Sequence, residues 1–125
     1  MRADKRIIFP SDRDIIEERD ADEYRDNLLS KVDNTDGLKN ILLDGYIVKF
    51  RVSKKMLNGL VKTYDMSGNL ISILQYVNNE RMGLYTKYDV TGFISCSGTY
   101  LHGRCCGTWK YYNEDGDVIK SVSYD

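Results

Sequence analysis

The chain has 125 residues, and its 18 Lys and Arg nearly balance its 19 Asp and Glu, for a formal net charge of −1. This length predicts one domain, and the charge balance gives no indication of nucleic-acid binding. The sequence has no apolar run long enough to span a membrane and no signal-peptide core, so we expect a cytoplasmic protein.

Residues 1–36 form an acidic segment, with eleven Asp and Glu against seven Lys and Arg. Apolar residues recur there at roughly helical spacing, and Tyr24 and Leu28 would meet on one helical face. The spacing predicts a mostly helical segment over about 12–32, with a break near Asp20–Asp22. Two roles are open for this helix: it could cover the open end of a sheet, or it could be an acidic arm that faces a partner.

From residue 37 to 125 the sequence is rich in glycine, tyrosine and β-branched residues, and one pattern recurs every 24 residues. A degenerate copy occupies about 37–58, and full copies start near 59, 83 and 107. A period of this size indicates a repeat array. The repeated positions are Gly59, Tyr64, Gly68 and Tyr76; Gly83, Tyr88, Gly92 and Tyr100; and Gly107, Tyr112, Gly116 and Tyr124.

Each copy divides into two strand-like runs joined by a short turn that contains glycine, which is typical of a β-hairpin. The second run alternates apolar and polar residues, as in a half-buried antiparallel sheet. We expect the turn glycines Gly68, Gly92 and Gly116 at positive φ. The predicted strands are Leu38–Leu43, a run containing Val48, Phe50 and Val52, then Leu60–Asp65, Leu70–Val77, Leu84–Asp89, Phe93–Leu101, Thr108–Asn113 and Val118–Tyr124.

The predicted fold is therefore mainly β: an open, curved antiparallel β-meander of repeated hairpins with an N-terminal helical segment. One side-chain direction stays open. Tyr64, Tyr88 and Tyr112 each lie three residues after a core-type position, which is the wrong parity for the same face unless a β-bulge intervenes.

The spacing of glycines and aromatic residues over 37–125 resembles the MORN repeat, in the variant found in bacterial and viral MORN-like proteins. The resemblance implies a curved β-meander that acts as a scaffold. Bacterial proteins of this variant are often labelled antitoxins, and other MORN proteins are linked to protein scaffolding and membrane lipids. It thus implies a non-enzymatic module that inhibits or neutralises a partner protein, as an antitoxin or a viral counter-defence protein would, in the cytoplasm of a bacterium or of an infected host cell.

Tyrosines and basic residues of the array are the candidate partner-binding residues, because tyrosine offers a large contact area at little cost in rotamer entropy. We expect one sheet face to present them to an acidic or polar protein, although the same tyrosines could instead cover their own core. The candidates are Lys62, Tyr85, Lys87, Arg104, Trp109, Lys110 and Tyr111.

Two other kinds of association remain open. Lys54, Lys55, Arg81 and Arg104 are expected in connections between repeats, where they could bind an anionic membrane surface. The exposed edge strands of an open meander could also pair two copies of the chain into a homodimer.

His102, Cys105 and Cys106 are the one cluster of metal-ligand residue types. Their spacing is not a usual zinc signature, no fourth ligand is evident, and a Cys–His nucleophile would lack a third residue to orient it. We interpret the cluster as part of a variable connection, and we expect no metal, no cofactor and no enzyme activity. A small enzyme that uses Cys105 or Cys106 is the alternative. Three cysteines, two of them adjacent, do not predict a disulfide framework.

Overall fold

The computed structural model describes residues 18–124, which form one helix followed by nine strands. The helix α1 spans Glu18–Ser30. The strands are β1 (Gly37–Leu43), β2 (Tyr46–Ser53), β3 (Met56–Leu57), β4 (Gly59–Tyr64), β5 (Leu70–Val77), β6 (Glu80–Tyr88), β7 (Ile94–Leu101), β8 (Arg104–Tyr112) and β9 (Val118–Tyr124).

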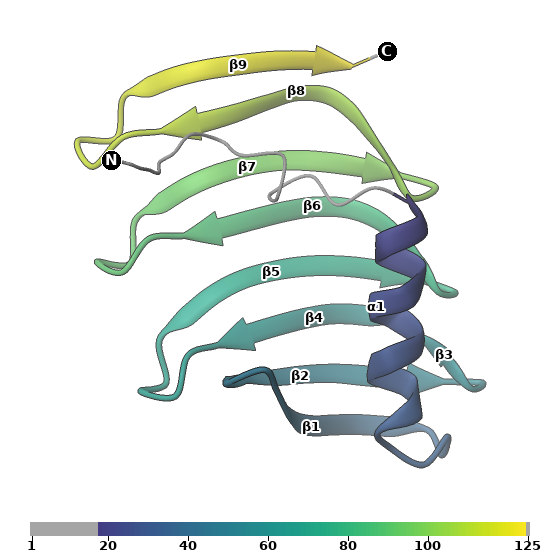
Figure 1. The fold of residues 1–125 in the computed structure, drawn as a ribbon. Helices are drawn as coiled ribbons and strands as arrows, with labels where there is room; N and C mark the ends of the chain where they lie inside the picture. Colours follow the sequence, from purple (N-terminus) through teal and green to yellow (C-terminus); the bar gives the residue numbers. More distant parts are fainter. Residues whose placement is uncertain (1–17, 125) are drawn as a thin grey trace.

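The strands form one antiparallel meander, in the order β1-β2-β4-β5-β6-β7-β8-β9, and the short β3 pairs with β2. Figure 1 shows the strands arched and the sheet open, with β1 and β9 at its two edges. The predicted fold, an open and curved antiparallel β-meander with an N-terminal helical segment, is confirmed.

At one end of the sheet, two-residue turns join successive strands and recur with the 24-residue repeat. Lys54–Lys55, Asn78–Asn79 and His102–Gly103 all have positive φ, the conformation that matches the twist of tight hairpins. Because these turns are so short, β6 and β8 start at Glu80 and Arg104, four residues earlier than predicted. Arg81 and Arg104 therefore lie in strands, and the expectation that they belong to connections is wrong.

The other end carries three longer turns, each built on an Asp or Asn. In the second copy, Oδ1 of Asp89 accepts hydrogen bonds from the backbone N–H groups of Thr91 (2.9 Å) and Phe93 (3.0 Å). Asp65 and Asn113 make the equivalent bonds in the other copies. The turn glycines Gly68, Gly92 and Gly116 have φ of 91°, 92° and 87°, which confirms the prediction for them.

Two substitutions of Asp89 should distinguish how much its hydrogen bonds stabilise the turn from how much its charge does. The bond from the Thr91 hydroxyl, followed by the backbone donors, holds the pKa of Asp89 below its usual value. A lowered folded pKa gives stability that is present at neutral pH and is lost as pH falls through that value, below about 4. Asp89→Asn keeps an acceptor, as Asn113 does naturally, so its melting temperature should fall less than the wild type's between about pH 7 and about pH 3.

The control for that comparison is Asp89→Ala, which removes the acceptor altogether. We expect it to lower the melting temperature at neutral pH by about 3–5 °C. Equal melting temperatures for the alanine variant and the wild type would show that the side chain does not hold the turn.

Each full copy contains one β-bulge within its hairpin, but the bulge does not bring the repeated tyrosine onto the face of the core position. The register shifts between Thr63 and Tyr64, and again at the equivalent sites before Tyr88 and Tyr112. The extra residue belongs to the second strand of each hairpin, as Ile71 shows: Thr63 pairs with Ser72, and Tyr64 pairs with Leu70. The tyrosine strand keeps its own alternation, so Tyr64 lies on the face opposite Val61.

Helix α1 lies across one face of the sheet, near the end with the two-residue turns (Figure 1). Its Leu28 is fully buried in a core with seven members, and Tyr24 and Leu29 pack against that core. Nη1 of Arg25 also donates to the backbone oxygen of Asn79 at 3.3 Å. We call this side of the sheet the helix face. The core residues are Leu28, Val48, Phe50, Val52, Leu57, Val61 and Tyr76.

Two expectations about the helix need correction. The helix is continuous over Glu18–Ser30, so the break expected near Asp20–Asp22 is wrong. It also covers a face and not the open end of the sheet, because the apolar residues Tyr24 and Leu28 point toward the strands. The predicted start near residue 12 lies outside the described residues.

A second core occupies the helix face toward β9, built around the single tryptophan. Trp109 is fully buried beside Cys96, Tyr100 and Tyr111. Its ring lies 5.0 Å from that of Tyr100 in an edge arrangement, and its Nε1 donates to the backbone oxygen of Thr99 at 3.2 Å. The tyrosines of the last repeat position thus serve the cores: Tyr76 lies in the first, Tyr100 in the second, and Tyr124 packs against the second.

Candidate functional site

The face opposite the helix carries the exposed part of the sheet. Directly paired residues of antiparallel strands share a face. Lys49 pairs with Lys62, and Arg51 pairs with Leu38, whereas Val48, Phe50 and Val52 between them enter the core on the helix face. We call the side of Lys49, Arg51 and Lys62 the opposite face.

A hollow of about 480 Å³ lies on the opposite face, over β1, β2 and β4. Three basic side chains of this face, those of Lys49, Arg51 and Lys62, lie there with two exposed leucines, Leu38 (73% exposed) and Leu60 (46% exposed). The fourth basic lining residue, Lys39, directs its side chain to the helix face. We call this feature the basic hollow. Its lining residues are Leu38, Lys39, Asn40, Lys49, Phe50, Arg51, Leu60, Lys62 and Tyr64.

In the described part of the chain, no acidic side chain neutralises the positive charge of the basic hollow. Among the residues that the structure describes, no ion pair joins a carboxylate to Lys49, Arg51 or Lys62. Lys49 and Lys62 are direct cross-strand partners, an arrangement that destabilises a sheet because like charges face each other. The ammonium of Lys49 lies 5.1 Å from the ring centroid of Tyr64, so a cation–π contact offsets part of this cost.

Replacing Lys62 with threonine is expected to stabilise the fold slightly. Thr86 holds the equivalent position one repeat later, so the sheet accommodates threonine there. Removing one charge of the Lys49–Lys62 pair should raise the free energy of unfolding by about 0.2–1 kcal/mol in urea titrations at low salt. The gain should shrink at high salt, because exposed charges are screened. A loss of stability would mean that the two lysines do not repel each other.

A second hollow, of about 240 Å³, lies where α1 meets the two-residue turns. Arg25 contacts Asp22 there at 3.0 Å, and Nδ1 of His102 lies 3.2 Å from Oε1 of Glu80. The buried Arg81 donates to the backbone oxygen of Gly103 at 2.6 Å and stacks 4.1 Å from the ring centroid of Tyr100. This hollow therefore helps to join the helix to the turns.

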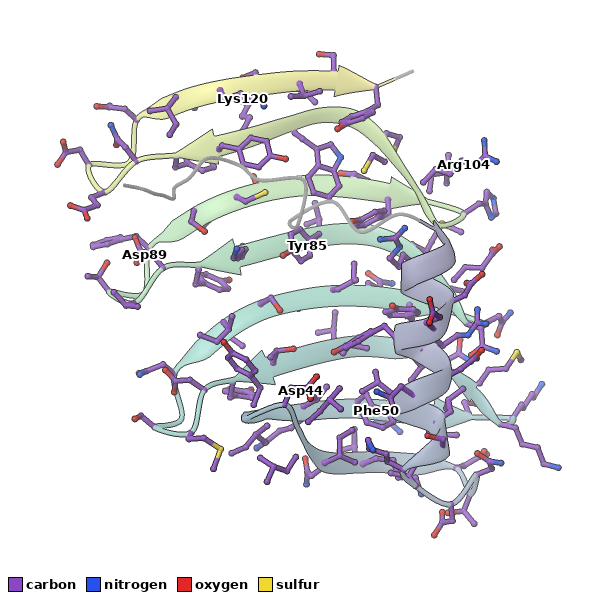
Figure 2. All side chains as sticks on the ribbon, in the orientation of Figure 1. Asp44, Phe50, Tyr85, Asp89, Arg104 and Lys120 are labelled. Atoms are coloured by element: carbon purple, nitrogen blue, oxygen red, sulfur yellow. The ribbon has the colours of Figure 1, made fainter. Side chains whose placement is uncertain are left out.

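The structure divides the seven predicted binding residues between both faces. Lys62 and Lys110 lie on the opposite face, but only Lys62 lines the basic hollow. Trp109 and Tyr111 are buried in the second core, and Tyr85 stacks on Trp109 with centroids 5.7 Å apart. Lys87 pairs with the buried Cys96 on the helix face, and Arg104 is exposed at the start of β8 (Figure 2). The single tyrosine–lysine surface that the sequence suggested is not formed by these residues.

His102, Cys105 and Cys106 do not converge. Cys105 pairs with Tyr100 on the helix face, Cys106 pairs with Thr99 on the opposite face, and His102 lies in the turn. Burial raises the pKa of the Cys105 thiol, whereas an activated thiol needs a lowered one. Both cysteines lie in β8, so the interpretation of the cluster as a connection holds only for His102. Within residues 18–124 no three potential metal ligands form a group.

Most of the residues of the basic hollow were not predicted from the sequence. Lys49, Arg51, Leu38 and Leu60 were not candidates, although Lys49 and Arg51 alternate with the core residues of β2 and so could have been placed on the opposite face. The pairing of Lys49 with Lys62 follows only from the register between the degenerate copy and the first full copy.

None of the described helices is long and apolar enough to cross a membrane.

No family model and no curated protein matches this sequence. Weak structural similarity is found to the accessory secretory proteins 1, 2 and 3 of Streptococcus pneumoniae, with 15% identity, a TM-score of 0.41, and coverage of 74% of this chain and 18% of that chain. The glycosylation-associated Gap123 complex of Streptococcus agalactiae gives 18% identity, a TM-score of 0.43, and coverage of 76% and 18%. The chain thus spans less than a fifth of those chains, and a likeness this weak assigns neither family nor function.

Proposed function

We propose that this chain is a non-enzymatic protein-binding module that inhibits or neutralises a partner by covering one of its surfaces, as an antitoxin or a viral counter-defence protein does. The observation that carries the proposal is the basic hollow, where Lys49, Arg51 and Lys62 stand among exposed leucines without a carboxylate partner in the described chain. The resemblance of the 24-residue repeat to MORN-type proteins supports the same proposal.

The chemistry of the hollow defines the partner. Three cations without a carboxylate partner among residues 18–124 favour a surface that presents Asp or Glu, and Leu38 and Leu60 favour aliphatic side chains beside those carboxylates. Lys49, Arg51, Leu60 and Lys62 lie on strands paired on both sides, so little ordering is needed on binding. The partner is therefore an acidic protein surface with aliphatic anchors.

Binding to an anionic membrane is the second candidate, since phosphate headgroups also attract lysine and arginine. The positions of the basic residues expected in connections do not favour membrane binding. Of the four expected in connections, Arg81 is buried and Arg104 lies in a strand, and Lys54 and Lys55 alone project from a turn.

Affinity capture of the partner from a native cell lysate, with the full chain as bait, tests the proposal. Wild type, the hollow variant Lys49→Ser/Lys62→Thr and the control Lys110→Thr should be used in parallel, because Lys110 is an exposed lysine of the opposite face outside the hollow. We expect wild type and control to capture one protein in stoichiometric amount and to reduce its activity, and the hollow variant to lose both effects. Equal capture by the hollow variant would refute the assignment to the hollow. Sedimentation with phosphatidylserine vesicles, reversed by salt, would support the membrane alternative.

A further inference from the structure

The two edges of the sheet differ in what they offer to another strand. The edge strand β1 carries Leu38 and Leu42 on the opposite face, 73% and 62% exposed, with Asn40 between them. At the other edge, β9 has Ser121 and Ser123 on that face and Lys120 near its middle, and its exposed apolar residues, Val118 (48%) and Ile119 (49%), are confined to its start beside the bulge. A central lysine and polar residues are typical of a protected edge, and exposed leucines are not.

The hydrogen-bonding groups on the open side of β1 belong to the same three residues. The turn Asp44–Gly45 has two residues at positive φ, so the flanking pair Leu43–Tyr46 is hydrogen-bonded. Alternation then directs the backbone groups of Ile41 and Lys39 toward β2. The N–H and C=O groups of Leu38, Asn40 and Leu42 point away from the sheet, where the described chain provides no partner strand.

We propose that β1 pairs with β1 of a second copy of this chain, antiparallel and in the register centred on Asn40. A twofold axis perpendicular to the sheet then places Leu38 opposite Leu42 of the other copy, Asn40 opposite Asn40, and Leu42 opposite Leu38. In this register, both leucine pairs are in contact, and the outward N–H and C=O groups of all three residues find hydrogen-bonding partners. A self-complementary strand is what a symmetric dimer requires.

Charge does not oppose this pairing. Lys39, the one charged residue of β1, lies on the helix face, and its Nζ is bound to Oδ1 of Asp33 at 2.8 Å and to the Thr35 hydroxyl at 2.9 Å within its own copy. The basic side chains Lys49 and Arg51 are one strand further in, so two intervening β1 strands separate them from their equivalents.

The second copy would also complete the basic hollow. Leu38 lines the hollow at the edge of the sheet, and Leu42 of the other copy would lie about 5 Å away, as cross-strand neighbours do. The pairing extends the wall of each hollow and places two hollows on one continuous surface. The dimer itself does not depend on the proposed function. The contact is small compared with stable interfaces, so we expect weak, concentration-dependent association.

Sedimentation velocity over a wide concentration range tests the pairing. We expect the wild type to dimerise, and both Asn40→Pro and Leu42→Lys to remain monomeric. Proline at residue 40 removes an outward N–H without breaking the β1–β2 ladder, and lysine at residue 42 places a charge opposite Leu38. The control is Leu84→Lys, because Leu84 is 67% exposed on the same face but lies in an interior strand, and it should dimerise like the wild type.

Amide hydrogen exchange provides a second measurement. The amides of Leu38, Asn40 and Leu42 should exchange fast in dilute solution and slowly at high concentration, whereas those of Lys39 and Ile41 should be slow in both. Four results would each overturn the proposal: a wild type that is monomeric throughout, dimerisation of Leu42→Lys or of a folded Asn40→Pro, loss of dimerisation in Leu84→Lys, or exchange at these three amides that does not change with concentration.

Discussion

Replacing Gly98 with alanine is expected to lower the free energy of unfolding by about 3 kcal/mol, the upper range for overpacking a core. A Cβ at this position would lie 2.0 Å from Cδ2 of the Trp109 ring and 2.2 Å from Cε2. The ring cannot move aside easily, since it is fully buried, packs on Tyr100 and donates a hydrogen bond to Thr99. Strand propensity by itself would make the substitution mildly stabilising, because glycine weakens a strand, so a loss of stability would come from the clash with the ring.

The measurement is urea unfolding followed by circular dichroism, with Ser97→Ala as the control. Ser97 is adjacent but lies on the opposite face, so its truncation should cost little. The double variant Gly98→Ala/Trp109→Leu should be more stable than the sum of the single effects predicts, by about 1 kcal/mol or more, because leucine leaves room for the new methyl group. Additive effects would show that the indole does not occupy the space above Gly98.

Replacing Leu28 with alanine is expected to destabilise the protein by about 3 kcal/mol, within the range for large-to-small changes in a core. Leu28 is the one fully buried leucine of α1, and it joins the helix to Val48, Phe50 and Val61 of the sheet. Its truncation removes contacts on both sides of that junction. Urea titration should show a lower midpoint, and amide exchange over α1 should accelerate more than exchange over β7.

Leu84→Ala is the matched control, since the same chemical change is made at a leucine that is 67% exposed. We expect its effect to stay within about 0.5 kcal/mol. A similarly small effect for Leu28→Ala would mean that the helix does not contribute to the core, and the acidic segment would then be free to face a partner as the second sequence hypothesis held.

The repeats could be predicted well because their determinants are local. A glycine that needs positive φ, such as Gly92, and the Asp89 side chain that bonds the turn are close together in sequence. The starts of β6 and β8 were placed too late because the turns before them use Asn78–Asn79 and His102–Gly103, where one or both residues are not glycine but still adopt positive φ.

The binding surface could not be predicted in the same way, because residue type does not reveal which side chains a core uses. Trp109 and Tyr111 have the composition of a binding surface, and the structure buries them. Lys49, in the degenerate copy, was not a predicted binding residue, but the sheet places it directly opposite Lys62. The difference arises from pairing between distant strands, which no short stretch of sequence encodes.

By itself, the amino-acid sequence determined the period, the hairpins and the open meander, since each depends on turns and alternation within about two dozen neighbouring residues. The tertiary structure alone decided which face each aromatic residue occupies, that α1 lies on the helix face, and that the basic hollow forms at the β1 side. The physical reason is that bulges shift the register between strands, and burial depends on what packs against a face; both are set by contacts between parts of the chain that are far apart in sequence.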